Sequence, residues 1–120
     1  MKVAINTCFG GFNLSHKAII AYAKRKGLNL VFKPDNVEDD TTFVHYYTKE
    51  PMVEANYYDT EEIYHSRADI DIIAVIEDLG QDADGRFAKL KIVTIPDDVE
   101  YTIEDYDGLE HIAEQHRTWS

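Results

Sequence analysis

The sequence predicts a single α/β or α+β domain, residues 1–120, in which a mixed sheet of about five strands packs against two helices. Three observations support this prediction. Hydrophobic residues make up 44% of the 120 residues, enough for one buried core. Two segments show the apolar spacing of amphipathic helices, and several short runs of β-branched and aromatic residues are typical of strands.

The chain opens with a predicted strand, helix and second strand. The first strand is the apolar run Lys2–Asn6. The helix is expected over His16–Lys26, because Ser15 can cap its start and Gly27 can end it. Leu28–Lys33 has the character of a second strand. The short joints predict a right-handed βαβ unit with parallel strands.

Residues 35–65 form an irregular insertion that is rich in acidic residues and tyrosine. Phe43–Thr48 has strand character, and no clear period follows it. Such a long irregular piece is either a functional flap or an element that the pattern does not reveal.

A second helix is expected after this insertion. Its apolar stripe comprises Ile72, Val75, Ile76 and Leu79. Ser66 and Asp69 stand three apart, as in a capping box, and Gly80 would close the helix. Phe87–Ile95 then alternates as a strand does.

The last segment fits two structures. Asp107-Gly108 between two apolar-rich runs is typical of a type I′ hairpin, with Tyr106 facing Leu109. The run from Leu109 also has helical spacing, with Asp107 as its cap. Residues 109–119 are therefore strand or helix, and we favour the hairpin.

The charge is large and unevenly placed. The formal net charge is −11, which argues against nucleic-acid binding by the whole surface. Residues 1–34 contain six of the 12 basic residues and none of the 23 acidic ones, so their charge is +6 and that of the remainder is −17. No apolar run is long enough for a membrane span or a secretory signal, and Cys8 is alone, so we expect a cytoplasmic protein.

The first candidate site is the loop between the first strand and the first helix. Gly10 and Gly11 would let a ligand approach the backbone, and unpaired N–H groups at the helix start attract anions. The side chains of Asn6, Thr7 and Ser15 could add hydrogen bonds. The loop is neither a Walker motif nor a dinucleotide fingerprint, and two glycines also suit a plain tight turn.

Two further features carry chemistry. Cys8 near a helix start could act as a nucleophile, although a small buried apolar residue is the favoured interpretation. At the C-terminus, Arg117 could bind phosphate and Trp119 could stack on a base, with His116 beside them, or the Trp could fill the edge of the core. No spacing matches a metal motif, so neither a metal nor a cofactor is expected.

Sequence runs in both halves of the chain carry a family resemblance. They are Val3–Phe12, Gly85–Lys91, Ile95–Glu100, Tyr106–Gly108 and His116–Trp119. Together they resemble a family of small, uncharacterised proteins common in bacteriophage and prophage genomes. The resemblance spans most of the chain apart from residues 35–65. It implies a phage setting in the cytoplasm of the infected cell, and it carries over no activity and no catalytic residues.

Our leading hypothesis is a phage counter-defence protein that sequesters a phosphorylated, nucleotide-derived small molecule. Asn6–Ser15 and Arg117–Trp119 would form its pocket. The alternative is an acidic protein-binding inhibitor of a host defence nuclease, of the DNA-mimic or anti-CRISPR type. A third possibility is a small phosphoester-processing enzyme, which we favour least because no nucleophile, base and orienting group can be assembled. Direct nucleic-acid or membrane binding is not expected, and a homo-oligomer remains open.

Overall fold

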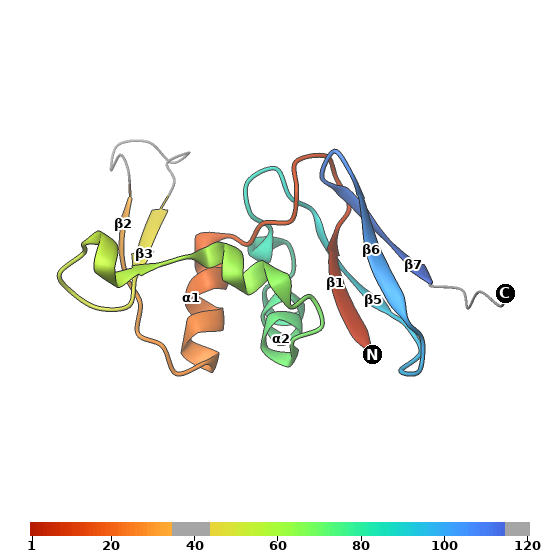
Figure 1. Cartoon of the computed structure of the whole chain (residues 1–120), viewed down its shortest axis with the longest axis horizontal. Coiled ribbons are helices and arrows are strands. Elements are labelled where there is room, and N and C mark those ends of the chain that lie inside the picture. The colour runs from red at the N-terminus through yellow and green to blue at the C-terminus, as the bar shows by residue number, and fades with distance from the viewer. Residues whose placement is uncertain (35–43, 115–120) are drawn as a thin grey trace, which may run out of the picture.

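The computed structural model describes residues 1–34 and 44–114, and it confirms the α+β class (Figure 1). The elements in chain order are β1 (Lys2–Asn6), α1 (His16–Arg25), β2 (Val31–Pro34), β3 (Val44–Tyr47), the 3₁₀-helix η1 (Glu54–Asn56), β4 (Tyr57–Tyr58), the 3₁₀-helix η2 (Thr60–His65), α2 (Ile70–Leu79), the 3₁₀-helix η3 (Gly80–Ala83), β5 (Leu90–Thr94), β6 (Tyr101–Tyr106) and β7 (Leu109–Glu114).

The strands form three small antiparallel sheets instead of the predicted single mixed sheet. The sheets have the orders β1–β5, β2–β3–β4 and β6–β7. Figure 1 shows the β2–β3 pair at one end of the molecule, α1 and α2 at its centre, and the other two sheets side by side at the far end. The helices thus separate two groups of strands.

The predicted parallel βαβ unit is wrong, because both edges of β1 are occupied by other partners. One edge pairs with β5, from Lys2 opposite Thr94 to Asn6 opposite Leu90. On the other edge, the N–H of Ala4 donates to the carbonyl of Arg67 at 2.8 Å, and that of Asn6 donates to Glu110 Oε1 at 2.9 Å. No edge of β1 is left for β2, which pairs with β3 instead.

Local signals placed the two helices well. Ser15 Oγ accepts from the N–H of Ala18 at 3.1 Å, and Gly27 has the expected positive φ of 77°. For α2 the capping residue is Asp69, whose carboxylate accepts from the N–H groups of Asp71 and Ile72. The capping-box alignment that starts at Ser66 is therefore displaced by one turn.

The favoured hairpin is confirmed. β6 and β7 pair in the predicted register, with Tyr106 opposite Leu109 and Ile103 opposite Ile112. The turn residues Asp107 and Gly108 both have positive φ, 53° and 90°, as a type I′ turn requires. Residues 115–119 of the predicted last element lie outside the described residues.

The described part of the 35–65 insertion, residues 44–65, belongs to the folded body. It contains β3, η1, β4 and η2, and it buries Tyr46 and Ile63 at 4% and 2% exposure. These two side chains join the core formed by the apolar faces of β1, α1 and α2. The sequence pattern predicted β3, within Phe43–Thr48, and it did not reveal η1, β4 and η2.

The basic end of α1 meets the acidic start of α2. Lys26 Nζ lies 2.9 Å from carboxylate oxygens of both Asp69 and Asp71, and Arg25 Nε lies 3.0 Å from Asp71. Each helix end thereby receives the side-chain charge that complements its dipole. Arg25 and Lys26, two of the six basic residues in residues 1–34, therefore have a structural role at this contact.

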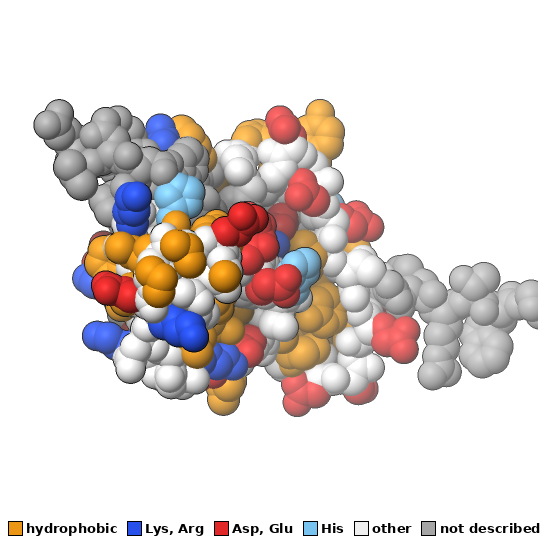
Figure 2. Space-filling view, turned by 60° about the vertical axis from the view of Figure 1, so that its left-hand side comes forward, with side chains coloured by type: hydrophobic (Ala, Val, Ile, Leu, Met, Phe, Trp, Pro, Cys, Tyr) orange, Lys and Arg blue, Asp and Glu red, His pale blue; other side chains and the backbone are white. Residues whose placement is uncertain are grey.

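The remaining charge is distributed unequally over the surface. In the view of Figure 2, Lys and Arg side chains gather at the left, and most Asp and Glu side chains lie at the centre and right. Among the described residues, no helix is long and apolar enough to cross a membrane.

The Lys26 cluster predicts a specific acid sensitivity. Partial burial opposes ionisation of Asp69, but hydrogen bonds from Lys26 and from backbone N–H groups lower its pKa overall. Hydrogen bonds from Lys26 and Arg25 likewise lower the pKa of Asp71. Stabilisation by these carboxylates is therefore present above their ordinary pKa of 3.8 and is lost as the pH falls below it.

We expect Lys26→Met to reduce the fall in the free energy of unfolding at acid pH, because the carboxylates lose the cation that lowers their pKa values. Urea unfolding followed by circular dichroism from about pH 7 to about pH 2.5 measures the effect. Lys24→Met, at the same exposed helix end, is the control and should keep the wild-type slope. Equal slopes in wild type and Lys26→Met would contradict the assignment.

Candidate functional site

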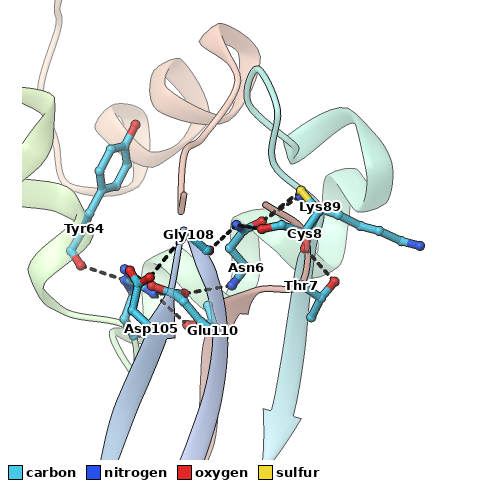
Figure 3. A network of polar contacts seen from close by, with 10 residues as sticks. Asn6, Thr7, Cys8, Tyr64, Lys89, Asp105, Gly108 and Glu110 are labelled. Atoms are coloured by element: carbon cyan, nitrogen blue, oxygen red, sulfur yellow. Dashed lines mark hydrogen bonds and ion pairs between the residues drawn. The ribbon is translucent and has the colours of Figure 1, made fainter. Parts of the chain in front are cut away.

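Asn6, the last residue of β1, is fully buried, and its side-chain amide is saturated by contacts within the chain (Figure 3). Its Nδ2 donates to the carbonyls of Cys8 and Gly108, at 2.6 and 2.7 Å. Its Oδ1 accepts from the N–H of Lys89 at 2.8 Å. Asn6 therefore ties three loops together and has no group left for a ligand.

Thr7 and Cys8 also bind within the chain. Thr7 Oγ1 donates to the carbonyl of Lys89 at 2.9 Å, and Cys8 Sγ donates to that of Phe87 at 3.0 Å. The second acceptor near the thiol is the Asn6 amide oxygen, at 3.5 Å. Neither oxygen is a base that would take the thiol proton, so the described contacts do not activate Cys8 as a nucleophile. Cys8 is only partly buried and is hydrogen-bonded, which differs from the small buried apolar residue expected from the sequence.

Gly10, Gly11 and Gly108 bring two loops into backbone contact, and we call them the glycine interlock. A Cβ on Gly108 would lie 2.3 Å from the Gly11 nitrogen and 2.7 Å from that of Gly10. A Cβ on Gly10 would lie 2.4 Å from the carbonyl oxygen of Phe87. The predicted anion loop thus packs against the hairpin turn, and its role in ligand binding stays a prediction.

Ser15 lies at the predicted place but its hydroxyl is engaged. It accepts from Ala18, as described, and donates to the carbonyl of Asp82 at 2.6 Å. The three C-terminal site residues, His116, Arg117 and Trp119, lie outside the described residues.

A cavity of about 550 Å³ opens beside the N-terminus of α1. Its walls come from the start of α1, from β3 and η2, and from the loop before β5. The lining residues are Asn13, Leu14, Ser15, His16, Ile19, Val44, Tyr46, Thr60, Glu61, Tyr64, Asp84, Gly85 and Arg86. Of the predicted site residues, Ser15 alone lines this cavity among those that the structure describes.

The cavity wall offers several kinds of polar group. His16 Nδ1 lies 2.7 Å from the hydroxyl of Tyr46, and the hydroxyl of Tyr64 accepts from the N–H of Leu14 at 3.2 Å. Burial lowers the pKa of His16 and raises those of Tyr46 and Tyr64. At neutral pH the wall therefore presents an uncharged imidazole and two protonated phenols, beside the charges of Glu61 and Arg86.

A buried ion pair holds the hairpin against the rest of the protein. The Arg67 guanidinium binds both carboxylate oxygens of Glu110, at 2.7 and 3.0 Å, and the side chains are 16% and 5% exposed. Arg67 Nε also donates to the carbonyl of Tyr64, and the guanidinium carbon lies 3.7 Å from the ring centroid of Phe12. This pair positions Tyr64, one wall of the cavity.

Most of these residues have no clear local signal in the sequence. Tyr64 stood out only as one of several crowded tyrosines, and nothing in the local pattern distinguishes Arg67 or Glu110. Arg86 lies in a run that carries the family resemblance, but the resemblance assigns it no role. In residues 1–34 and 44–114, no group of three His, Cys, Asp or Glu side chains is arranged to hold a metal ion.

Comparisons with protein-family models, curated proteins and solved structures find no match to this chain. A functional proposal therefore depends on the chain's own geometry and on the sequence motifs.

We expect Arg67→Met to destabilise the protein by about 3–5 kcal/mol, because it leaves Glu110 buried without its cation. Urea unfolding at neutral pH measures this. Arg25→Met, which removes the half-exposed pair with Asp71, is the matched control and should cost less than about 1 kcal/mol. Similar losses in the two variants would show that the buried pair has no special structural role.

The glycine interlock gives a second stability prediction. Gly108→Ala should destabilise by about 3 kcal/mol, because its Cβ meets backbone atoms and its φ is +90°. Gly27→Ala, at the left-handed end of α1 with φ +77° and no atom within 4 Å of the added Cβ, should cost only about 1 kcal/mol. If both variants unfold at the same urea concentration, the close backbone approach at Gly108 adds nothing to the cost of a side chain there, and the prediction is wrong.

Proposed function

We propose that the protein binds a phosphorylated, nucleotide-derived small molecule in the cavity beside the N-terminus of α1. The observation that carries the proposal is the cavity itself, whose volume of about 550 Å³ is within the usual range for small-molecule sites. The ligand class is the one expected from the sequence. Its site is residues 13–16, which follow the glycine loop in the same segment, instead of the glycine loop itself.

The start of α1 and Arg86 support an anionic group on the ligand. The N-terminus of a helix carries partial positive charge and unpaired N–H groups, which favour phosphate. Arg86 lines the same cavity, and a guanidinium binds phosphate oxygens in pairs. His16, kept neutral by burial, adds a hydrogen-bonding ring without adding charge.

The rest of the wall supports a ligand that also has hydroxyl donors and a flat apolar part. The Glu61 carboxylate repels phosphate but accepts hydrogen bonds from sugar hydroxyls. Tyr46 and Tyr64 supply aromatic surface with polar tips, which suits a base or a sugar face. A nucleotide derivative combines all three chemical features.

Sequestration is proposed in preference to turnover. Within residues 1–34 and 44–114, the Cys8 thiol hydrogen-bonds to a backbone carbonyl and an amide oxygen, and His16 Nδ1 is engaged by Tyr46. Neither contact supplies a nucleophile beside a base. The phage setting implied by the family resemblance suggests counter-defence, by removal of a signalling nucleotide from the host cytoplasm.

Thermal unfolding with a panel of cyclic nucleotides, ADP-ribose derivatives and ordinary nucleotides tests the proposal. At a hundredfold excess over Kd, a true ligand should stabilise by about 2.7 kcal/mol, a rise in Tm of roughly 10 °C. Arg86→Ala should weaken binding at least tenfold, because a charge-assisted contact is lost. Mass spectrometry of compounds released from the denatured protein supplies candidates outside the panel.

Two controls separate the cavity from the glycine loop. Arg25→Ala removes a cation from the far end of α1 and should leave the affinity unchanged. Thr7→Val and Cys8→Ser alter the loop and should also leave it unchanged. The cavity proposal fails if no phosphorylated compound stabilises the protein, or if Arg86→Ala binds as the wild type does.

A second candidate function is the acidic inhibitor of a host defence nuclease. The charge of −17 after Pro34 and the acidic face in Figure 2 favour it. Carboxylates on such a face would replace DNA phosphates in a basic groove of the target, which gives a strongly salt-dependent complex.

A further inference from the structure

Three exposed aromatic side chains, far apart in the sequence, border the glycine interlock. Phe9, Phe87 and Tyr106, which we call the aromatic tip, are 59%, 70% and 75% exposed. The rings of Phe9 and Tyr106 meet edge to face, with centroids 6.4 Å apart. A Cβ on Gly10 would lie 2.8 Å from Phe87 Cβ, which places Phe87 against the same loop. Clustered exposed aromatic rings mark interaction surfaces.

The backbone beneath the aromatic tip is held rigidly. The Asn6 amide ties the strands beneath it, the Cys8 thiol donates to the carbonyl of Phe87, and Gly10 donates to the carbonyl of Asp107. Phe87 itself has a φ of +62°, a conformation that bulky residues rarely adopt. Figure 1 shows the loop after β1 beside the β6–β7 turn at the top of the molecule. Rings presented by a rigid backbone lose little entropy on binding.

The charge around Tyr106 and Phe9 selects the kind of partner. From residue 95 to residue 114 the chain contains no Lys or Arg. Its acidic residues there are Asp97, Asp98, Glu100, Glu104, Asp105, Asp107, Glu110 and Glu114. Arg86 lies beside Phe87, with its guanidinium carbon 5.1 Å from the ring centroid. Nucleic acids and anionic lipids would be repelled by the hairpin, and a basic protein surface would be attracted.

We propose that the aromatic tip docks into an apolar socket on a protein whose surface around that socket is basic. Phe9 and Tyr106 enter the socket, and the hairpin carboxylates face the basic rim. This inference rests on the second candidate function and names the surface that it would use. It is independent of the cavity ligand.

Site-specific photo-cross-linking identifies the partner. A benzoylphenylalanine replaces Tyr106 in the full chain, which is then illuminated in a nuclease-treated bacterial lysate. The matched control carries the same probe in place of Tyr57, an aromatic residue of β4 that is 48% exposed. The expected result is one basic protein cross-linked from position 106 and not from position 57. No product, equal products at both positions, or attachment to lipid, nucleic acid or a second copy of this chain would overturn the proposal.

Binding of the identified protein, purified, then tests the contact itself. Tyr106→Ser and Phe9→Ser should each raise Kd at least tenfold, as expected for central aromatic contacts, and higher salt should raise it further. Both side chains are exposed, so the Tm of each variant should match that of wild type, and so should its response to cavity ligands.

Egg-white lysozyme, a basic protein, serves as the charge-only reference. The binding of lysozyme to this protein gives the salt dependence of attraction by charge alone. If the identified partner binds the serine variants as tightly as wild type and shows the same salt dependence as lysozyme, docking through the aromatic tip is overturned while the acidic-inhibitor function stands. If neither protein binds at low salt, both fail together.

Discussion

The buried pair of Arg67 and Glu110 is the interaction on which the arrangement of this molecule depends. It joins residues 43 apart in sequence and links the β6–β7 hairpin, the edge of β1 opposite β5 and the segment that leads into α2. Buried ion pairs contribute little net stability compared with apolar packing, but an unpaired member is very unfavourable. The pair therefore favours this placement of the hairpin, since a placement that buried one of the two groups without the other would be very unfavourable.

That placement determines the two surfaces to which we assign binding. With the hairpin held against β1, its turn reaches the loop after β1, and the Asn6 amide bonds to Gly108. The same loop contacts residues 87–89, the end of a segment whose Gly85 N–H donates to Asn13. Within this segment Arg86 lines the cavity and the neighbouring Phe87 belongs to the aromatic tip. One short segment therefore supplies a side chain to each surface.

Features with local causes could be predicted from the sequence, and pairings between distant segments could not. Ser15, Gly27 and the Asp107-Gly108 turn act on neighbouring backbone groups, so their residue types reveal the helix ends and the hairpin. The partner of β1 depends on which segment reaches its edge. The segment at the edge opposite β5 contains Arg67, 63 residues after Ala4, which hydrogen-bonds to that residue, and no local pattern distinguishes this arginine from a surface cation. The cavity has the same origin, because its walls come from four separate segments.

The glycine loop shows how a correct observation led to an incomplete interpretation. Two glycines between a strand and a helix are compatible with an anion cradle and equally with close contact between two backbones. The deciding residue is Gly108, about a hundred positions away, where an added Cβ would meet the backbone nitrogens of Gly10 and Gly11. Tight backbone contact in turn leaves no room there for the flanking side chains, so Phe9 and Tyr106 lie outside it. The exposure of these rings is thus a direct consequence of the interlock, and their mutual edge contact gives the exposed surface a defined shape.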